Sequence, residues 1–234
     1  MNSDRFANVL GQEYNFFNKS VPRHDEFQDK VGKIIKNYSA SLQGDVISVV
    51  EGGSGTGLTT VRVLDANNRI KVIGIDNEEK TINQARVILR EYGDRVTLHK
   101  EDLLVALRKM STESADIFTS VWVIHNLTPE YRTQLFSEIA RVLKIGGLFV
   151  NGDKYARDDQ KAHNQDLENQ IKAFDVFDTI QRPDLKKEWT EHYQEDEKIK
   201  FTENQQNKIL NDLGFKNIEI QFRKGMEAII TAIR

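Results

Sequence analysis

Residues 49–60 read VVEGGSGTGLTT, an apolar run that ends in one acid and leads into glycine at four of the next six positions. An apolar strand followed by a glycine-rich loop is typical of α/β folds that bind nucleotides, because glycine lets the backbone come close to a ligand. The stretch therefore predicts such a fold and raises the question of which ligand its loop holds.

Two phosphate-binding patterns nearly match this loop. The P-loop pattern G-x-x-x-x-G-K-[ST] fits from Gly52 to Thr59, but Leu58 stands where the pattern needs the lysine that neutralises the phosphates. The dinucleotide pattern G-x-G-x-x-G fits Gly53 and Gly55, and its third glycine falls on the same Leu58. Leu58 therefore argues against a nucleoside triphosphate and against a nicotinamide oxidoreductase.

A third pattern fits without a mismatch: the acid Glu51, followed by glycine at positions 53, 55 and 57. An acid beside the loop would repel a pyrophosphate, but it suits the positive sulfonium and α-ammonium groups of S-adenosylmethionine. Asp76 ends the next apolar run, where a carboxylate can accept hydrogen bonds from both ribose hydroxyls. Asp102 follows the third run, where it can accept from the adenine amine.

Short apolar runs alternate with longer helical patterns between residues 44 and 153. Strands are expected at 45–51, 70–76, 95–100, 115–123 and 147–153, and helices at 57–66, 78–92, 102–110 and 129–144. This alternation predicts a parallel sheet with helices on both faces. The three acids then lie at the carboxyl ends of successive strands and face one crevice.

The segments outside this core are expected to belong to the same single domain. Residues 1–43 predict a helical cap, and the charged residues 154–200 predict either a helical lid over the crevice or a solvated helical hairpin. Residues 201–234 predict a helix that begins at Thr202 and ends at Gly214, followed by a hairpin of 216–222 and 227–234. The domain is expected to be a monomer or a homodimer.

Four blocks in this order resemble the class I S-adenosylmethionine-dependent methyltransferases. The blocks are VVEGGSGTG (49–57), VIGIDNEEKTINQAR (72–86), LHKEDLL (98–104) and ADIFTSVWVIHNLTPEYRTQLFSEIARVLKIGGLFV (115–150). The last block departs from the family pattern at Ile145, where proline is usual, which should cost only turn rigidity. The resemblance covers most of the chain.

The resemblance implies a Rossmann-like α/β fold whose seven-stranded mixed sheet has the order 3-2-1-4-5-7-6, with strand 7 antiparallel. It implies S-adenosyl-L-methionine as cofactor and S-adenosyl-L-homocysteine as product. It also implies that the backbone at glycines 53, 55 and 57 lies close to the methionine part of the cofactor. The expected cofactor-binding residues are Arg23, Glu51, Gly53, Gly55, Gly57, Asp76, Asn77, Asp102, Leu103, Val121 and Trp122.

Residues 6–27 and the segment after the fifth strand are similar to a narrower group within that family. The group holds small-molecule methyltransferases and the carboxy-S-adenosylmethionine synthase of tRNA wobble-uridine modification. The synthase holds its extra carboxylate with an arginine, and Glu191 or His192 stands at the corresponding position of this chain. The expected activity is therefore methyl transfer to a small-molecule acceptor. The synthase activity and a noncatalytic cofactor-binding protein stay open as alternatives.

Methyl transfer needs a base only where the acceptor must lose a proton. His125, just past strand four, is expected at the mouth of the crevice as that base, or else as a cap of its turn. His192 can reach the site if its segment is a lid, and otherwise lies on a solvated helix. Tyr14 can cover the sulfonium of the cofactor, or else it anchors its own helix. Arg23 can pair with the carboxylate of the cofactor, or else it is exposed. Trp122 can line the pocket, or else it packs in the core.

The composition of the chain bears on its possible binding partners and on its location in the cell. The net charge of −3 and pI near 6.0 give no basic footprint for nucleic acid, and the absence of cysteine excludes disulfides and thiolate sites. Neither a secretory signal nor an apolar run of roughly 18 residues is present, so no membrane association and a cytoplasmic location are expected. Histidines 24, 125, 163 and 192 lack metal-ligand spacing, so no metal is expected.

Overall fold

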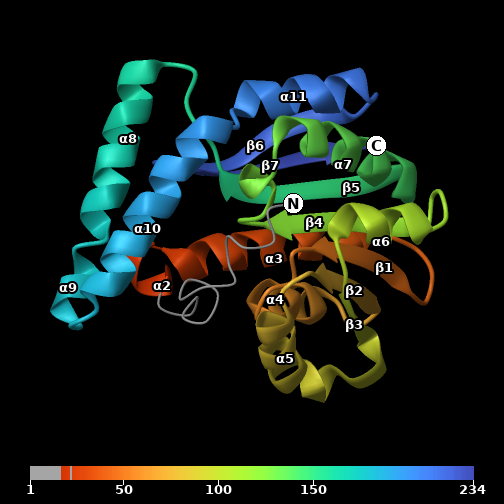
Figure 1. The fold of residues 1–234 in the computed structure, drawn as a ribbon. Helices are drawn as coiled ribbons and strands as arrows, with labels where there is room; N and C mark the ends of the chain where they lie inside the picture. The colour runs from red at the N-terminus through yellow and green to blue at the C-terminus, as the bar shows by residue number, and fades with distance from the viewer. Residues whose placement is uncertain (1–16, 22) are drawn as a thin grey trace.

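The centre of the fold is one sheet of seven strands in the order β3-β2-β1-β4-β5-β7-β6 (Figure 1). This computed structural model describes residues 17–21 and 23–234. Tyr14 lies outside the described residues. β1 (Ile47–Gly52), β2 (Ile70–Asp76), β3 (Val96–Lys100), β4 (Ala115–Val121) and β5 (Leu143–Lys154) run parallel to one another. β7 (Glu227–Ile233) lies antiparallel between β5 and β6 (Lys216–Lys224), so the predicted topology is confirmed.

Helices cover both faces of this sheet. One face carries α3 (His24–Ser41), α4 (Leu58–Ala66) and α5 (Glu79–Ile88), and the short η2 (Leu89–Arg95) follows α5. The other face carries α6 (Leu103–Lys109), α7 (Pro129–Val142) and α11 (Glu203–Asp212). Their apolar stripes pack on the strands as two cores, one on each side of the sheet.

Local sequence signals account for most helix starts. Thr128 caps α7 by accepting a hydrogen bond from the amide of Tyr131, and Pro129 occupies the first turn. Thr202 and Gln205 form a reciprocal capping box at the start of α11, as the sequence predicts. Gly214 follows that helix with φ 85°, a left-handed conformation that favours glycine.

Two predicted helices end earlier than their sequence pattern indicates. α7 ends at Val142, because Leu143 already has extended backbone angles and pairs with Ala115 of β4. α5 ends at Ile88, and residues 89–95 continue as a tighter helix with non-helical angles at Gly93. At the end of α7 the amides of Glu113 and Ser114, just before β4, donate to the carbonyls of Arg141 and Val142, which a longer helix would have used.

The charged segment after β5 folds as a packed helical layer. It contains α8 (Gln160–Ala173), α9 (Val176–Thr179), α10 (Pro183–Asp196) and η4 (Glu197–Ile199), and α9 contacts the short α2 (Phe17–Ser20). Figure 1 shows α8 and α10 lying together at one end of the sheet, beside α3. Five of its aromatic and aliphatic side chains are buried in the same core as α3: Phe174, Phe177, Leu185, Trp189 and Tyr193. The layer is therefore not a solvated hairpin.

Within the part of the chain that the structure describes, no helix is both long enough and apolar enough to cross a bilayer.

Candidate functional site

A cavity opens at the carboxyl ends of β1, β2 and β4, the edge where open α/β sheets bind ligands. Its walls come from the glycine loop after β1, the first turn of α5, the end of β4 and the start of α3. No arginine or lysine of the described residues lines it. The cavity therefore suits a ligand that does not bring a phosphate group to its walls.

The glycine loop is held against β2 by its own amides. The amides of Gly53 and Ser54 donate to the carbonyl of Ile75 at 2.7 and 3.1 Å, and the amide of Gly55 donates to Asp76 Oδ2 at 2.8 Å. A Cβ on Gly53 would lie 2.2 Å from Val123 Cγ2, whereas one on Gly55 would meet nothing within 4 Å. Gly53 and Gly55 both line the cavity, and the space at Gly53 admits only a bare backbone.

Gly57 does not belong to that wall, contrary to the sequence expectation. It precedes α4 with φ 89°, and a Cβ there would approach Leu89 at 3.2 Å. Its small size lets α4 start close to α5 and η2, so its role is in packing rather than in contacting a ligand.

Glu51 lies behind the loop, is 1% exposed and does not itself line the cavity. Thr60 Oγ1 donates to its Oε2 at 2.6 Å, while Oε1 has no hydrogen-bond partner within residues 17–21 and 23–234. Burial raises the pKa of Glu51 to about 8, a rise that the Thr60 hydrogen bond only partly opposes. A buried oxygen without a donor is costly, and it fits a site that gains a donor when a cationic ligand binds.

Asp76 lines the cavity from the end of β2, and the adjacent Asn77 lines it as well. Its Oδ2 accepts from Gly55 and its Oδ1 accepts from the amide of Glu78 at 2.9 Å. Burial raises the pKa of Asp76, and these backbone hydrogen bonds act in the opposite direction. Each carboxylate oxygen keeps a second lone pair, so Asp76 can still accept from a ligand hydroxyl.

Asp102 is placed differently from the prediction. Its Oδ1 caps α6 by accepting from the amide of Val105 at 3.1 Å, and it accepts from the Tyr131 hydroxyl at 2.9 Å. The cavity is lined by its neighbours Glu101 and Leu103 instead. An acid directly before a helix is a preferred N-cap, and this local role turns Asp102 away from the cavity.

The far wall of the cavity is aromatic. Val121 and Trp122 line it as predicted, and Trp122 has φ 56°, an unusual value for a bulky residue. The indole stacks on His24 with ring centroids 4.9 Å apart and on Phe27 at 4.8 Å.

His24 is a cavity residue that the sequence reasoning missed. It is 4% exposed, its Nδ1 lies 3.3 Å from Asp25 Oδ1, and its Nε2 has no hydrogen-bond partner in the described part of the chain. Burial lowers the pKa of His24, so the neutral ring prevails at neutral pH. Its neighbour Arg23, which the sequence singled out, is half exposed, pairs with Glu26 at 3.2 Å and does not line the cavity.

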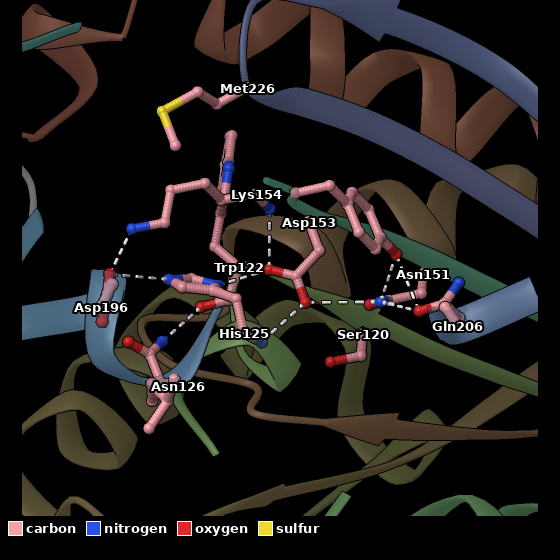
Figure 2. Close-up of polar contacts among 12 residues, drawn as sticks. Ser120, Trp122, His125, Asn126, Asn151, Asp153, Lys154, Asp196, Gln206 and Met226 are labelled. Atoms are coloured by element: carbon pink, nitrogen blue, oxygen red, sulfur yellow. Dashed lines mark hydrogen bonds and ion pairs between the residues drawn. The ribbon is translucent and has the colours of Figure 1, made fainter. Parts of the chain in front are cut away.

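His125 lies in the short η3 (Ile124–Asn126), where it is buried and does not line the cavity. Its Nδ1 is 2.5 Å from Asp153 Oδ1, and its amide donates to Asp153 Oδ2 at 3.1 Å (Figure 2). Its Nε2 faces Asp196 Oδ2 at 3.8 Å. The expected position at the mouth of the crevice is therefore wrong, because α10 covers this ring.

His192 is also buried, which excludes both of its sequence interpretations: it neither reaches the cavity nor lies on a solvated face. Its Nε2 is 3.5 Å from Asp196 Oδ2, one helical turn along α10. Lys154 forms an ion pair with the same Asp196, and its ammonium lies 3.7 Å from the centre of the Tyr193 ring. Burial alone would raise the pKa of Asp196, but the charges of Lys154, His125 and His192 together lower it.

Comparisons with known proteins fit this geometry. Residues 49–147, from β1 into β5, match the model of a methyltransferase domain family. This chain contains a class I S-adenosylmethionine-dependent methyltransferase domain. The matched residues include the glycine loop, Asp76 and the strand that carries Trp122 into the cavity.

The methyltransferase domain has distant curated relatives that are carboxy-S-adenosyl-L-methionine synthases. One from Nautilia profundicola is 24% identical over 88% of this chain and 83% of the relative. Another from Sulfurimonas denitrificans is 24% identical over the full length of both.

Solved structures share the fold of the domain. An O-methyltransferase family protein from Burkholderia thailandensis has a TM-score of 0.70 at 16% identity, over 100% of this chain and 63% of that one. An S-adenosylmethionine-dependent methyltransferase from Archaeoglobus fulgidus has a TM-score of 0.59 at 15% identity, over 88% of this chain and 94% of that one.

Proposed function

We propose that the domain binds S-adenosylmethionine in the cavity and transfers its methyl group to a small-molecule acceptor. The observation that carries this proposal is Glu51 behind the glycine loop, with one buried oxygen that lacks a donor among the described residues. The α-ammonium of the cofactor supplies such a donor, and a pyrophosphate would be repelled. When bound, the cofactor supplies an electrophilic methyl group on a sulfonium.

The cavity walls divide between the parts of that cofactor. Gly53 and Gly55 offer a bare backbone to the methionine part, and Asp76 with Asn77 can accept the ribose hydroxyls. Leu103 gives an apolar surface for adenine, beside Glu101. Trp122 and His24 close the remaining side, where the acceptor enters.

His24 is the histidine that this site offers as a base. Its Nε2 lacks a partner within the described residues, and its lowered pKa keeps it neutral and ready to accept a proton from an acceptor hydroxyl or amine. Most of the rate would come from holding donor and acceptor in line, an effect of roughly 7–11 kcal/mol. Asp76, Trp122 and the loop supply that fixed geometry.

The names of the curated relatives raise carboxy-S-adenosylmethionine synthesis as a second function. An additional carboxylate on the cofactor needs a cationic partner inside the site. Arg157 and Arg182, in the segment after β5, pair with Asp166 and Asp184, and neither lines the cavity. Glu191 is exposed and lies near Lys187 on α10. This arrangement favours methyl transfer.

Titration calorimetry tests the cofactor assignment. We expect the domain to bind S-adenosylhomocysteine and not NAD(H), and the reverse result would overturn the proposal. Mass spectrometry then separates the activities, with the cofactor incubated with the protein, a set of small methyl acceptors and a set of small carboxylic acids as carboxyl donors. Recovery of S-adenosylhomocysteine supports methyl transfer, recovery of a carboxylated cofactor supports the synthase, and an unchanged cofactor indicates a noncatalytic binding protein.

A further inference from the structure

A second cluster of chemically reactive side chains lies apart from the cavity, where α10 packs over the turn that follows β4. His125 comes from that turn, and His192 and Asp196 come from α10, at a spacing of four residues that places both on one helix face. All three side chains are buried, and none lines the cofactor cavity. Nothing in the proposed methyl transfer uses them.

The three donor atoms converge on one point. His125 Nε2 lies 3.8 Å and His192 Nε2 lies 3.5 Å from Asp196 Oδ2, and all three atoms are within 4.8 Å of one another. Ligands at about 2.0–2.1 Å around a tetrahedral ion are separated by about 3.3 Å. Shifts of a few tenths of an ångström would therefore bring Asp196 to both histidines at metal-bound separations, and the two imidazole donors, which are up to 4.8 Å apart, must approach each other by more.

The far side of His125 has the arrangement that supports a metal ligand. Asp153 holds its Nδ1 at 2.5 Å, and Asn151 Nδ2 donates to that carboxylate at 3.3 Å (Figure 2). A carboxylate on one ring nitrogen orients the ring and makes the other nitrogen a better ligand, once the ion displaces the proton from that nitrogen. That nitrogen, Nε2, faces Asp196.

We propose that His125, His192 and Asp196 form a site for a divalent transition-metal ion that joins α10 to the turn after β4. Two imidazoles and one carboxylate are the donors that suit Zn²⁺ and Fe²⁺, and a water molecule or a ligand completes the coordination. The ion would fasten the helical layer 160–199 to the sheet at the point where β4 and β5 end.

Lys154 competes with the ion for this site. Its ammonium forms an ion pair with Asp196 Oδ2, the same oxygen that would bind the metal. Binding must displace that ammonium, which keeps its contact with the Tyr193 ring. The lysine thus serves as the cation of the metal-free form, and its removal should strengthen metal binding while removal of a ligand weakens it.

Cobalt and zinc titrations of the metal-free full chain test the site. We expect Co²⁺ to give visible absorption bands of an ordered nitrogen and oxygen site, Zn²⁺ to displace it, and the melting temperature to rise with Zn²⁺. Asp153→Asn, which removes the support of His125, should weaken affinity by about 10–100-fold. His192→Ala and Asp196→Asn should weaken it more, and Lys154→Met should strengthen it.

His163→Ala is the matched control, because His163 is another buried histidine with one carboxylate partner, Glu197, at 2.9 Å. We expect this variant to bind the ion as the unchanged chain does. The proposal is overturned if Co²⁺ binds neither the unchanged chain nor Lys154→Met, or if His163→Ala weakens binding as much as His192→Ala. Cofactor binding does not enter any of these measurements, so the result stands apart from the methyl transfer proposal.

Discussion

At the residue scale, burial behind the cofactor loop changes the pKa of Glu51. With its pKa raised to about 8, the side chain is protonated at pH 7 in the free protein. Between about pH 4.5 and pH 8 the folded domain keeps a proton on Glu51 that the unfolded chain loses. The free energy of unfolding of the ligand-free domain therefore falls as the pH rises through this range. A cationic ligand reverses the preference and favours the carboxylate.

Cofactor binding should therefore release a proton from Glu51 at pH 7. We expect calorimetry in phosphate and in Tris buffer to give different enthalpies of S-adenosylhomocysteine binding. The difference should correspond to the release of close to one proton per site. Glu51→Gln should remove the buffer dependence and weaken binding. Equal enthalpies in both buffers for the unchanged chain would show that Glu51 does not meet the ammonium.

His24 gives a second prediction at this scale, which needs no knowledge of the acceptor. Because burial lowers its pKa, we expect the His24 ring resonance to titrate below pH 6.5 in NMR spectra, with assignment by His24→Asn. S-adenosylhomocysteine should shift that resonance and leave the His163 resonance in place. A His24 midpoint above 6.5, or no response to the ligand, would remove His24 from the site.

At the scale of elements, the glycine loop allows two reasons for glycine to be compared: lack of space for a side chain, and a backbone angle that other residues rarely adopt. Gly53 and Gly55 both have left-handed angles, with φ of 75° and 50°, but only Gly53 faces a neighbour, Val123. Gly55→Ala should cost about 1 kcal/mol of unfolding free energy from the backbone alone. Gly53→Ala should cost clearly more, because the loop must move away from Val123. Urea unfolding measures both, and equal losses would contradict the geometry.

Arg132 shows how one side chain connects separate elements. From α7 it donates to the carbonyl of His125 at 3.2 Å and to that of Lys200 at 3.2 Å, and its guanidinium stacks 4.4 Å from the Phe201 ring centre. Burial lowers the pKa of Arg132 to about 10, which still leaves it charged at neutral pH. The Arg132 guanidinium therefore fixes the position of the turn that contains His125 relative to the end of the helical layer.

At the scale of the whole molecule, the helical layer 160–199 shares a core with α3 instead of folding by itself. Phe177 is fully buried in that core, next to Phe174 at 6.1 Å between ring centres. Phe177→Ala should lower the unfolding free energy by about 3–5 kcal/mol in a single transition. Circular dichroism during urea unfolding checks this, and an early separate transition would show that the layer unfolds independently.

The alternation of strands and helices was predictable because it depends on short-range signals. Alternating apolar runs and helical patterns indicated the parallel sheet, and Thr202 and Pro129 marked helix starts that the structure confirms. The terminal hairpin indicated an antiparallel last strand, and the resemblance to methyltransferases supplied the order of the strands. The helix end at residue 142 was not predictable, because pairing with the segment around β4 decides it.

Local patterns in the chain were sufficient to predict the fold class and the kind of ligand loop, because glycine spacing, Glu51 and Asp76 act within a few residues. Which side chains meet depends on tertiary packing. It turned Asp102 into a helix cap and Gly57 into a packing contact, brought His24 to the cavity, and buried His125 and His192 around Asp196. These contacts join residues far apart in the chain, and their geometry depends on how α3 and α10 pack on the sheet, which local patterns do not encode.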